Sequence, residues 1–177
     1  MKKIYIFLVV SIIMQADNTW YLRENKNNDF YFVDRQNKIM IPPKKYKMIF
    51  TENFNNFAIV VNLESKVVAI NKNEELLYEV FVYDNGPDYI NDGLFRIVKN
   101  GKIGFANEEG EIVINPTYDF ADFFVKGYSI VNLGGEKIYH GENWSWAGGK
   151  WGVIDKKGEI IIDIIYDSYE EALAKLK

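Results

Sequence analysis

The chain contains no cysteine, and this absence limits both its chemistry and its architecture. Without a thiol the protein can form no disulfide, no thiolate metal site and no cysteine nucleophile, and it has no cysteine to carry a lipid anchor. Many exported proteins rely on disulfides, although a stack of repeats can supply stability instead. The lack of cysteine is therefore compatible with export.

Histidine and clustered positive charge are also scarce. His140 is the sole histidine, so a multi-histidine metal site is excluded, and only this residue could serve in a serine triad. We interpret His140 as a solvated loop residue. The net charge is −4, and no stripe of Lys and Arg alternates with aromatic residues, which argues against a nucleic-acid partner. We expect no metal and no cofactor.

Long apolar runs are missing except at the N-terminus. Residues 1–16 combine a basic start, Lys2-Lys3, with eleven nearly all apolar residues from Ile4 to Met14, which is typical of a secretory signal and too short to span a bilayer comfortably. We predict a signal peptide, an exported mature chain in the periplasm or outside the cell, and no integral membrane protein. In the alternative, residues 5–13 form a buried strand of a cytoplasmic protein.

What the chain does contain is a pattern that occurs four times. An Asp or Asn precedes an internal turn at positions spaced by 37, 36 and 48 residues, and an apolar run follows each of them. Such internal self-similarity outranks every local signal in assigning a fold. We call these residues the repeat anchors: Asp34, Asn71, Asn107 and Asp155.

Turn chemistry explains the pattern. An Asp or Asn can hydrogen-bond to the backbone two residues on, and Gly110 and Gly158, three residues past their anchors, supply the positive φ that such a turn needs. Runs of β-branched and aromatic residues between these turns favour strands over helices. Pro116 cannot donate to a sheet, so it should end its strand or lie at an edge.

These patterns predict an all-β fold of about four antiparallel three-stranded units in one domain, residues 17–177. A Tyr-Asp pair closes the later units, as at Tyr118 and Tyr166. The approximate units are 19–50, 57–84, 94–119 and 128–167.

The fourth unit resembles the bacterial WG, or KWG, repeat. The resemblance is carried by the run from Lys150 to Asp155 with Trp151 and Gly152, then by Gly158, the three isoleucines that follow, and Tyr166-Asp167. Residues 101–119 resemble a degenerate copy that keeps Gly104 but has Ile103 in place of the tryptophan. The first two units have lost both the Trp-Gly pair and the turn glycine.

The resemblance implies short all-β repeats, frequent export, and a binding or structural role without a general enzymatic activity. It also implies that Trp-Gly is positional. Gly152 would let the chain approach a neighbouring unit closely, and Trp151 would bury a large ring face against that unit.

An insert breaks the repeat spacing between the third and fourth units. Residues 137–149 contain Tyr139, Trp144 and Trp146 among several glycines, and insertions in repeat arrays often form the binding face. On a Gly-rich loop these aromatic residues could stack on a sugar or hold a peptide. In the alternative, one of the tryptophans folds inward and fills a repeat junction.

The carboxylates offer a weaker case for chemistry. A glycosidase needs two of them flanking one bond, and three pairs could be formed on paper: Asp84 with Asp88, Asp119 with Asp122, and Asp163 with Asp167. Because each Tyr-Asp recurs at the repeat spacing, a corner-forming hydrogen bond is the better explanation. The anchors lack the alternating ligands of a calcium loop as well.

The C-terminal segment, residues 168–177, is the one helical stretch. Ser168 and Glu171 form a capping box, and we expect Leu173 and Leu176 to pack over the last unit as a cap. The fourth unit has no apolar strand after its corner. Residues 19–24 could supply that strand and close the array into a ring, or the array stays open.

The sequence thus predicts a non-catalytic, exported repeat scaffold that binds a protein or a polymer of the cell envelope. The alternative function is a carbohydrate-binding module that uses Tyr139, Trp144 and Trp146, and a glycan-cleaving enzyme is a distant third.

Overall fold

The computed structural model describes residues 18–141 and 143–176. Regular structure in this part of the chain is almost entirely antiparallel β-sheet, and the one helix described, α1 (Tyr169–Ala174), lies near the C-terminus. The prediction of an all-β repeat fold with a short terminal helix is confirmed. The predicted signal peptide, residues 1–16, lies outside the described residues.

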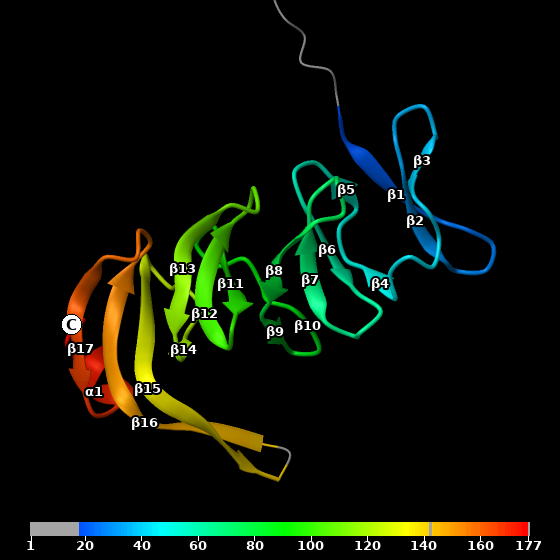
Figure 1. Cartoon of the computed structure of the whole chain (residues 1–177). Helices are drawn as coiled ribbons and strands as arrows, with labels where there is room; N and C mark the ends of the chain where they lie inside the picture. Colours follow the sequence, from blue (N-terminus) through cyan, green and yellow to red (C-terminus); the bar gives the residue numbers. More distant parts are fainter. Residues whose placement is uncertain (1–17, 142, 177) are drawn as a thin grey trace, which may run out of the picture.

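Each of the four predicted units contains one antiparallel three-stranded meander, and the meanders follow one another along the molecule (Figure 1). Their strands are β1 (Trp20–Glu24), β2 (Phe30–Val33) and β3 (Ile39–Ile41); β6 (Ala58–Val61), β7 (Val67–Ile70) and β8 (Leu76–Val80); β11 (Leu94–Lys99), β12 (Lys102–Asn107) and β13 (Ile112–Tyr118); and β15 (Tyr128–His140), β16 (Asn143–Asp155) and β17 (Ile160–Tyr166). Short connecting strands are β4 (Met48–Ile49), β5 (Asn53–Phe54), β9 (Val82–Tyr83), β10 (Gly86–Pro87) and β14 (Phe120–Ala121).

The four repeat anchors lie at tight turns of one construction. The Asp34 Oδ1 accepts hydrogen bonds from the N–H groups of Gln36 and Lys38, both at 2.9 Å. The other three anchors accept from the second and fourth following residues in the same way. The third residue after each anchor has a positive φ, and this holds for Glu74 (62°) as well as for Gly110 (84°). The side-chain bonds thus hold the turn even where the second unit lacks glycine.

Strand pairing joins each unit to the next. β4 pairs with β6, the end of β8 pairs with β11, and β14 pairs with β15. The first strand of a following unit therefore always pairs with the end of the preceding third strand or with the segment after it. As a result, one seven-stranded sheet, in the order β13-β12-β11-β8-β7-β6-β4, runs through the second and third units.

The Trp-Gly glycines lie at β-bulges inside their own units. A Cβ on Gly104 would lie 2.4 Å from the Ile114 carbonyl oxygen, and a Cβ on Gly152 would lie 2.7 Å from that of Ile162. The register of the third strand shifts at these points. The prediction that Gly152 brings the chain close to a neighbouring unit is therefore wrong, because the close approach is to the third strand of the same unit.

Contacts between units involve the turn glycines instead. A Cβ on Gly110 would lie 2.4 Å from the Phe57 ring, and a Cβ on Gly158 would lie 3.3 Å from Ile114 of the third unit. The Tyr78 hydroxyl donates to the Gly110 carbonyl at 2.9 Å. The core is accordingly a series of apolar clusters along the array, and the third of its junctions is filled by Phe105, Ile114, Phe124, Val131 and Ile154.

The array is open. β1 pairs with β2 and with β5, and within the described residues β17 pairs with β16 alone. Figure 1 shows β1 and β17 at opposite ends of the molecule. Of the two predicted alternatives, ring closure by the N-terminal strand does not occur.

The helix α1 covers the last unit as a cap. Ser168 is its N-cap, with its side chain accepting from the Glu171 N–H at 3.2 Å. Tyr169 and Leu176 pack with buried Trp151 and Ala172, whereas Leu173 is 41% exposed. The cap therefore uses Tyr169 where we expected Leu173.

Candidate functional site

The insert forms the outer half of a long hairpin, and this differs from the loop that we predicted. β15 and β16 pair from Tyr128↔Asp155 to His140↔Asn143, so residues 137–149 are strand on both sides of the tip. Gly134, Gly148 and Gly149 have positive φ values and mark an irregularity within the hairpin. Figure 1 shows the outer half of the hairpin bending and projecting beyond the rest of the array.

The predicted aromatic residues share one face of this hairpin. Tyr139 lies opposite Trp144, and Lys137 lies opposite Trp146, so all four side chains project to the same side. The Lys137 Nζ is 4.2 Å from the centroid of the Trp144 ring and 5.2 Å from that of Tyr139. This cation–π contact holds the outermost rings in a defined arrangement.

The two tryptophans meet a ring from the preceding junction. The Phe120 ring of β14 lies 6.4 Å from Trp144, 5.5 Å from Trp146 and 5.6 Å from Trp151, measured between centroids. Together with the start of α1, these rings line a groove of about 340 Å³, which we call the aromatic groove. Its lining also includes Asp167, Ser168, Tyr169 and Glu170.

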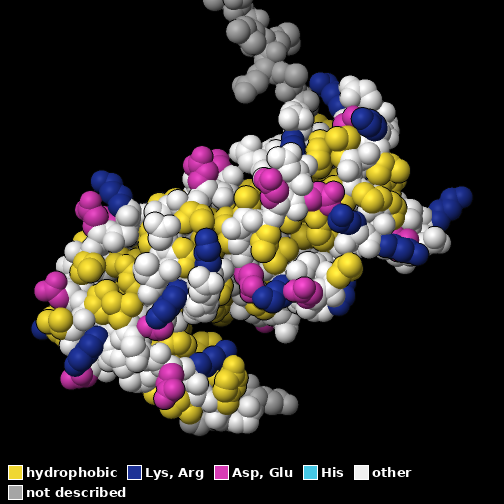
Figure 2. All heavy atoms as spheres, in the orientation of Figure 1, with side chains coloured by type: hydrophobic (Ala, Val, Ile, Leu, Met, Phe, Trp, Pro, Cys, Tyr) yellow, Lys and Arg dark blue, Asp and Glu magenta, His cyan; other side chains and the backbone are white. Residues whose placement is uncertain are grey.

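The tryptophans differ in exposure. Trp144 is 44% exposed and Tyr139 is 69% exposed, whereas Trp146 is half-buried and Trp151 is buried. The expectation that one tryptophan of the insert folds inward thus describes Trp146 in part. Figure 2 shows apolar side chains on the projecting hairpin, separated from the body by a hollow.

A buried asparagine fixes the position of Trp146. The Trp146 Nε1 donates to the Asn132 Oδ1 at 3.0 Å, and the Gly135 N–H donates to the same oxygen at 2.9 Å. The Asn132 Nδ2 donates in turn to the Gly148 carbonyl at 3.1 Å. Sequence reasoning missed Asn132, although a polar residue at the end of the apolar run from Ile130 is a signal that could have found it. Because Asn132 is fully buried, these bonds hold one wall of the groove in place.

The Tyr-Asp pairs lie at corners between units. Tyr118 is buried, and Asp119 accepts from the Gly134 N–H at 2.7 Å and from the Lys102 Nζ at 2.5 Å. Burial opposes the charge on Asp119, but the bonds from Lys102 and the Gly134 N–H outweigh it and lower the pKa of this carboxyl. In the fourth unit, Tyr166 is half-buried, and the Asp167 carboxylate accepts from the Lys150 Nζ at 2.5 Å. These aspartates thus have structural partners.

A buried ion pair that sequence reasoning did not find lies at the junction of the second and third units. The Arg96 guanidinium donates to both Asp88 oxygens, at 2.9 and 2.6 Å, and the Arg96 N–H also donates to this carboxylate. The Phe81 ring lies 4.2 Å from the guanidinium carbon. Arginine in the apolar run Leu94–Val98 was the signal. Both charged groups thus have partners in the fold, whereas Asp84, the other member of the predicted pair, is exposed.

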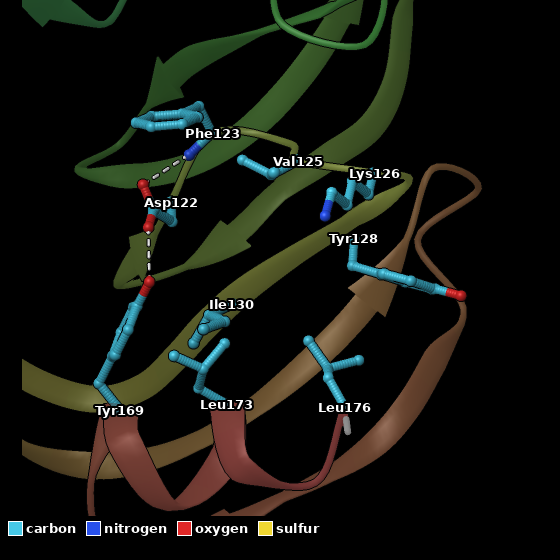
Figure 3. A pocket seen from close by; sticks show the side chains of 9 residues that line it. All are labelled: Asp122, Phe123, Val125, Lys126, Tyr128, Ile130, Tyr169, Leu173 and Leu176. Atoms are coloured by element: carbon cyan, nitrogen blue, oxygen red, sulfur yellow. Dashed lines mark hydrogen bonds between the residues drawn. The ribbon is translucent and has the colours of Figure 1, made fainter.

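The seam beneath α1 forms a second groove of about 270 Å³ (Figure 3). The Tyr169 hydroxyl points toward Asp122 and donates to its Oδ2 at 2.9 Å, while the Phe123 N–H donates to the other oxygen. Burial and this hydrogen bond raise the pKa of Tyr169 to about 12. Asp122 therefore anchors the cap and is not paired with Asp119.

Residues 18–141 and 143–176 contain no group of three or more His, Asp or Glu side chains arranged to hold a metal ion. In the same ranges, no helix has the length and apolar character needed to cross a membrane.

Comparisons with known proteins give one match. Residues 32–64, 103–136 and 151–171 match the family model described as WG containing repeat. Each segment begins in the middle strand of a meander, the first, third or fourth, and the first two segments continue into the first strand of the next meander. They include Trp151, Gly152 and the anchors Asp34, Asn107 and Asp155. Nothing matches among the curated proteins or among the solved structures.

Proposed function

The chain belongs to the WG-containing repeat family, and from this premise we propose that it is a non-catalytic, exported scaffold that binds a macromolecule of the cell envelope through the aromatic groove. The observation that carries the proposal is the placement of Trp144 and Trp146 around Phe120 on a projecting hairpin. Large rings beside a few polar groups in a concavity are typical of binding sites.

Preorganisation supports a binding role for this surface. Lys137 contacts the Trp144 ring, and Asn132 fixes Trp146, so the rings need little ordering when a ligand arrives. Binding is stronger when the side chains of a site are already immobilised, because less conformational entropy is lost. An exposed ring that only filled a junction would need no such support.

The carboxylates support a role without catalysis. Glycoside cleavage requires two carboxyl groups placed on either side of one bond. Of the acids that line the aromatic groove, Asp167 is paired with Lys150, and the buried acids elsewhere serve the fold. Activity assays on envelope glycans test this part of the proposal, and turnover that depends on Asp167 or Glu170 would contradict it.

Export is the part of the proposal that rests on the sequence of residues 1–16. Expression of the full chain in a bacterial host, followed by cell fractionation and N-terminal sequencing, tests it. We expect a mature chain that begins near residue 17 in the exported fraction. Recovery of the uncleaved chain in the cytoplasm would refute export without affecting the binding proposal.

Binding is tested with purified envelope material. We expect the protein to be retained on peptidoglycan or on envelope membranes, and Trp144→Ala with Trp146→Ala to abolish this retention. Tyr89→Ala is a matched control, because Tyr89 is 58% exposed and lies away from the aromatic groove. Equal retention of the double variant and the control would refute the groove as the binding surface.

Carbohydrate is the second candidate ligand, and the groove itself favours it. Aromatic ring faces stack on the apolar faces of sugars, and Asp167, Ser168 and Glu170 offer hydrogen-bond partners at the rim. A glycan array with the wild type and the double variant separates the two candidates. Retention on a glycan that needs Trp144 would support the sugar, and binding to envelope proteins alone would exclude it.

A further inference from the structure

The charge of the chain is distributed unequally along the array. The first unit, residues 19–50, contains seven Lys and Arg side chains against three Asp and Glu, a net charge of +4. Residues 51–177 contain twelve against twenty-one, a net charge of −9. Because the first unit forms one end of the array, the molecule has a basic end (Figure 1). A charge asymmetry of this kind indicates an anionic partner for that end.

The basic end has a groove in which lysines lie beside exposed apolar side chains. This groove of about 340 Å³ lies where the first unit meets the second, and we call it the basic groove. Its lining includes Phe30, Lys44, Lys47, Met48 and Leu63. Leu63 is 67% exposed, Met48 is 48% exposed and Phe30 is 37% exposed. Figure 2 shows Lys and Arg side chains beside apolar ones at this end of the molecule.

The two lysines of the basic groove keep their charge available to a ligand. The Lys44 side chain is 74% exposed and lies 3.9 Å from Asp29, a contact that water screens. The Lys47 Nζ donates to the hydroxyl of Ser65 at 2.6 Å, and this partner is neutral. Among the described residues that line the groove, Asp29 is the one acid, and its carboxylate also accepts from the Asn25 side chain. The groove is therefore positive on balance.

The apolar side chains of the basic groove decide between the classes of anionic partner. A nucleic acid or a phosphate polymer is held by cations, and single strands also stack their bases on aromatic rings. Leu63 and Met48 have no ring and would gain nothing from phosphates. At the surface of a bilayer, apolar side chains leave water for the acyl boundary while lysines stay among the headgroups. The combination therefore fits an anionic lipid surface.

The acidic remainder of the chain does not oppose this interaction at physiological salt. Charges in water are screened beyond the Debye length, which is about 8 Å at about 0.15 M ionic strength. Adjacent strands lie about 4.8 Å apart, so β6, β7 and β8 together separate the basic end from the third and fourth units by more than that length. In the nearer second unit, Glu74 is already paired with Lys45, 3.3 Å away. Glu79 is likewise paired with Lys66.

We propose that the basic groove binds the surface of a membrane that contains anionic phospholipids, with Lys44 and Lys47 at the phosphate groups and Met48 and Leu63 at the acyl boundary. The array then stands on the membrane by its first unit. The aromatic groove lies in the fourth unit and remains accessible to its own ligand. The two surfaces share no residue, so this inference does not depend on the function proposed for the aromatic groove.

Co-sedimentation of the full chain with lipid vesicles tests this surface. We expect binding to vesicles of phosphatidylglycerol and phosphatidylcholine in equal parts that exceeds binding to phosphatidylcholine alone and weakens as salt is added. Lys44→Glu with Lys47→Glu should weaken binding to the anionic vesicles about tenfold or more, because one lysine near such a surface contributes about fivefold. Lys156→Glu with Lys157→Glu is the matched control. It makes the same charge change at an exposed turn of the fourth unit and should bind within about twofold of the wild type.

A change of one exposed apolar residue keeps the test decisive if the lysine variant folds poorly. Leu63→Gln should weaken binding to the anionic vesicles several-fold, since Leu63 is largely exposed and its loss leaves the charge unchanged. Equal binding to both kinds of vesicle, or undiminished binding by the variant of Lys44 and Lys47, would overturn the proposal. Binding to polyphosphate or duplex DNA that needs these lysines, with vesicle binding insensitive to Leu63→Gln, would also overturn it. So would an oligomer of the chain alone that the lysine variant dissociates, because a second copy would then cover the groove.

Discussion

The buried pair of Arg96 and Asp88 gives the most direct test of how the units are held together. Arg96 is 3% exposed and Asp88 is 7% exposed, and removing one partner of a buried ion pair typically costs about 3–5 kcal/mol because the other charge stays unpaired. In Asp88→Asn, the amide oxygen still accepts one bond from the guanidinium. We therefore expect the free energy of unfolding to fall by about 3 kcal/mol, the lower end of this range. For a chain of this length, such a loss lowers Tm by about 6–12 °C.

Urea denaturation followed by tryptophan fluorescence measures this loss. Asp84→Asn is the matched control, because Asp84 is exposed and asparagine tolerates its positive φ, so its effect should stay within about 0.5 kcal/mol. Replacing both partners, with Asp88→Leu and Arg96→Met, should recover much of the loss because no charge is then left unpaired. A loss below about 1 kcal/mol for Asp88→Asn, or a double variant worse than the single one, would refute the reasoning.

Three further predictions concern the fourth unit and its corners. Gly152→Ala should lower the free energy of unfolding by about 2–4 kcal/mol in urea melts, because the new Cβ would lie 2.7 Å from the Ile162 carbonyl oxygen and the backbone would have to move. A change of only about a few tenths of a kcal/mol would contradict this prediction. Trp151→Ala should cost about 3–5 kcal/mol by thermal melting, since this ring is buried against Phe120 and Tyr169. The pKa of Asp119 is lower in the folded protein than its ordinary value of 3.8, so the carboxylate stabilises the fold at every pH above 3.8. This stabilisation is lost as the pH falls through the pKa of the folded state. Asp119→Asn should accordingly flatten the acid limb of the stability curve, and an unchanged limb would argue against the role of the Lys102 bond.

Local chemistry predicts much of this fold. The turns after Asp34 and Asp155 follow from an acceptor side chain and a residue that tolerates positive φ, and both signals lie within five residues of sequence. Pro116 lies in an edge strand, as the missing N–H requires. Signals of this kind need no knowledge of neighbouring units.

The hairpin that carries Trp144 could not be predicted in the same way. Its glycines suggested a loop, yet Gly134 and Gly149 lie at an irregularity between two paired stretches, and the outer strands alternate normally beyond it. Whether glycine ends a strand or bends it depends on the partner strand, which the local sequence does not specify.

Contacts between separate segments of the chain could not be predicted from the sequence either. Phe120 precedes Trp146 by 26 residues (146 − 120), and only the fold brings the two rings together. The pairing of Arg96 with Asp88 depends on how the connection between β10 and β11 folds back, which no repeat spacing indicates. Arg96 stands out in the sequence as a charge in an apolar run, and Phe120 as an aromatic ring without an assigned role. Nothing in the local sequence identifies the residue that each of them contacts.

The turn glycines have a consequence for how such a chain can evolve. Gly110 makes room for Phe57 and Gly158 for Ile114, whereas the second unit has Glu74, which accepts from the Tyr46 hydroxyl at 3.2 Å. Each turn therefore fits only the unit before it, and moving Glu74 into the place of Gly110 would force a carboxylate against the Phe57 ring. The units are not interchangeable parts, and a duplicated unit can be inserted only if two positions, one on each side of the new junction, change together.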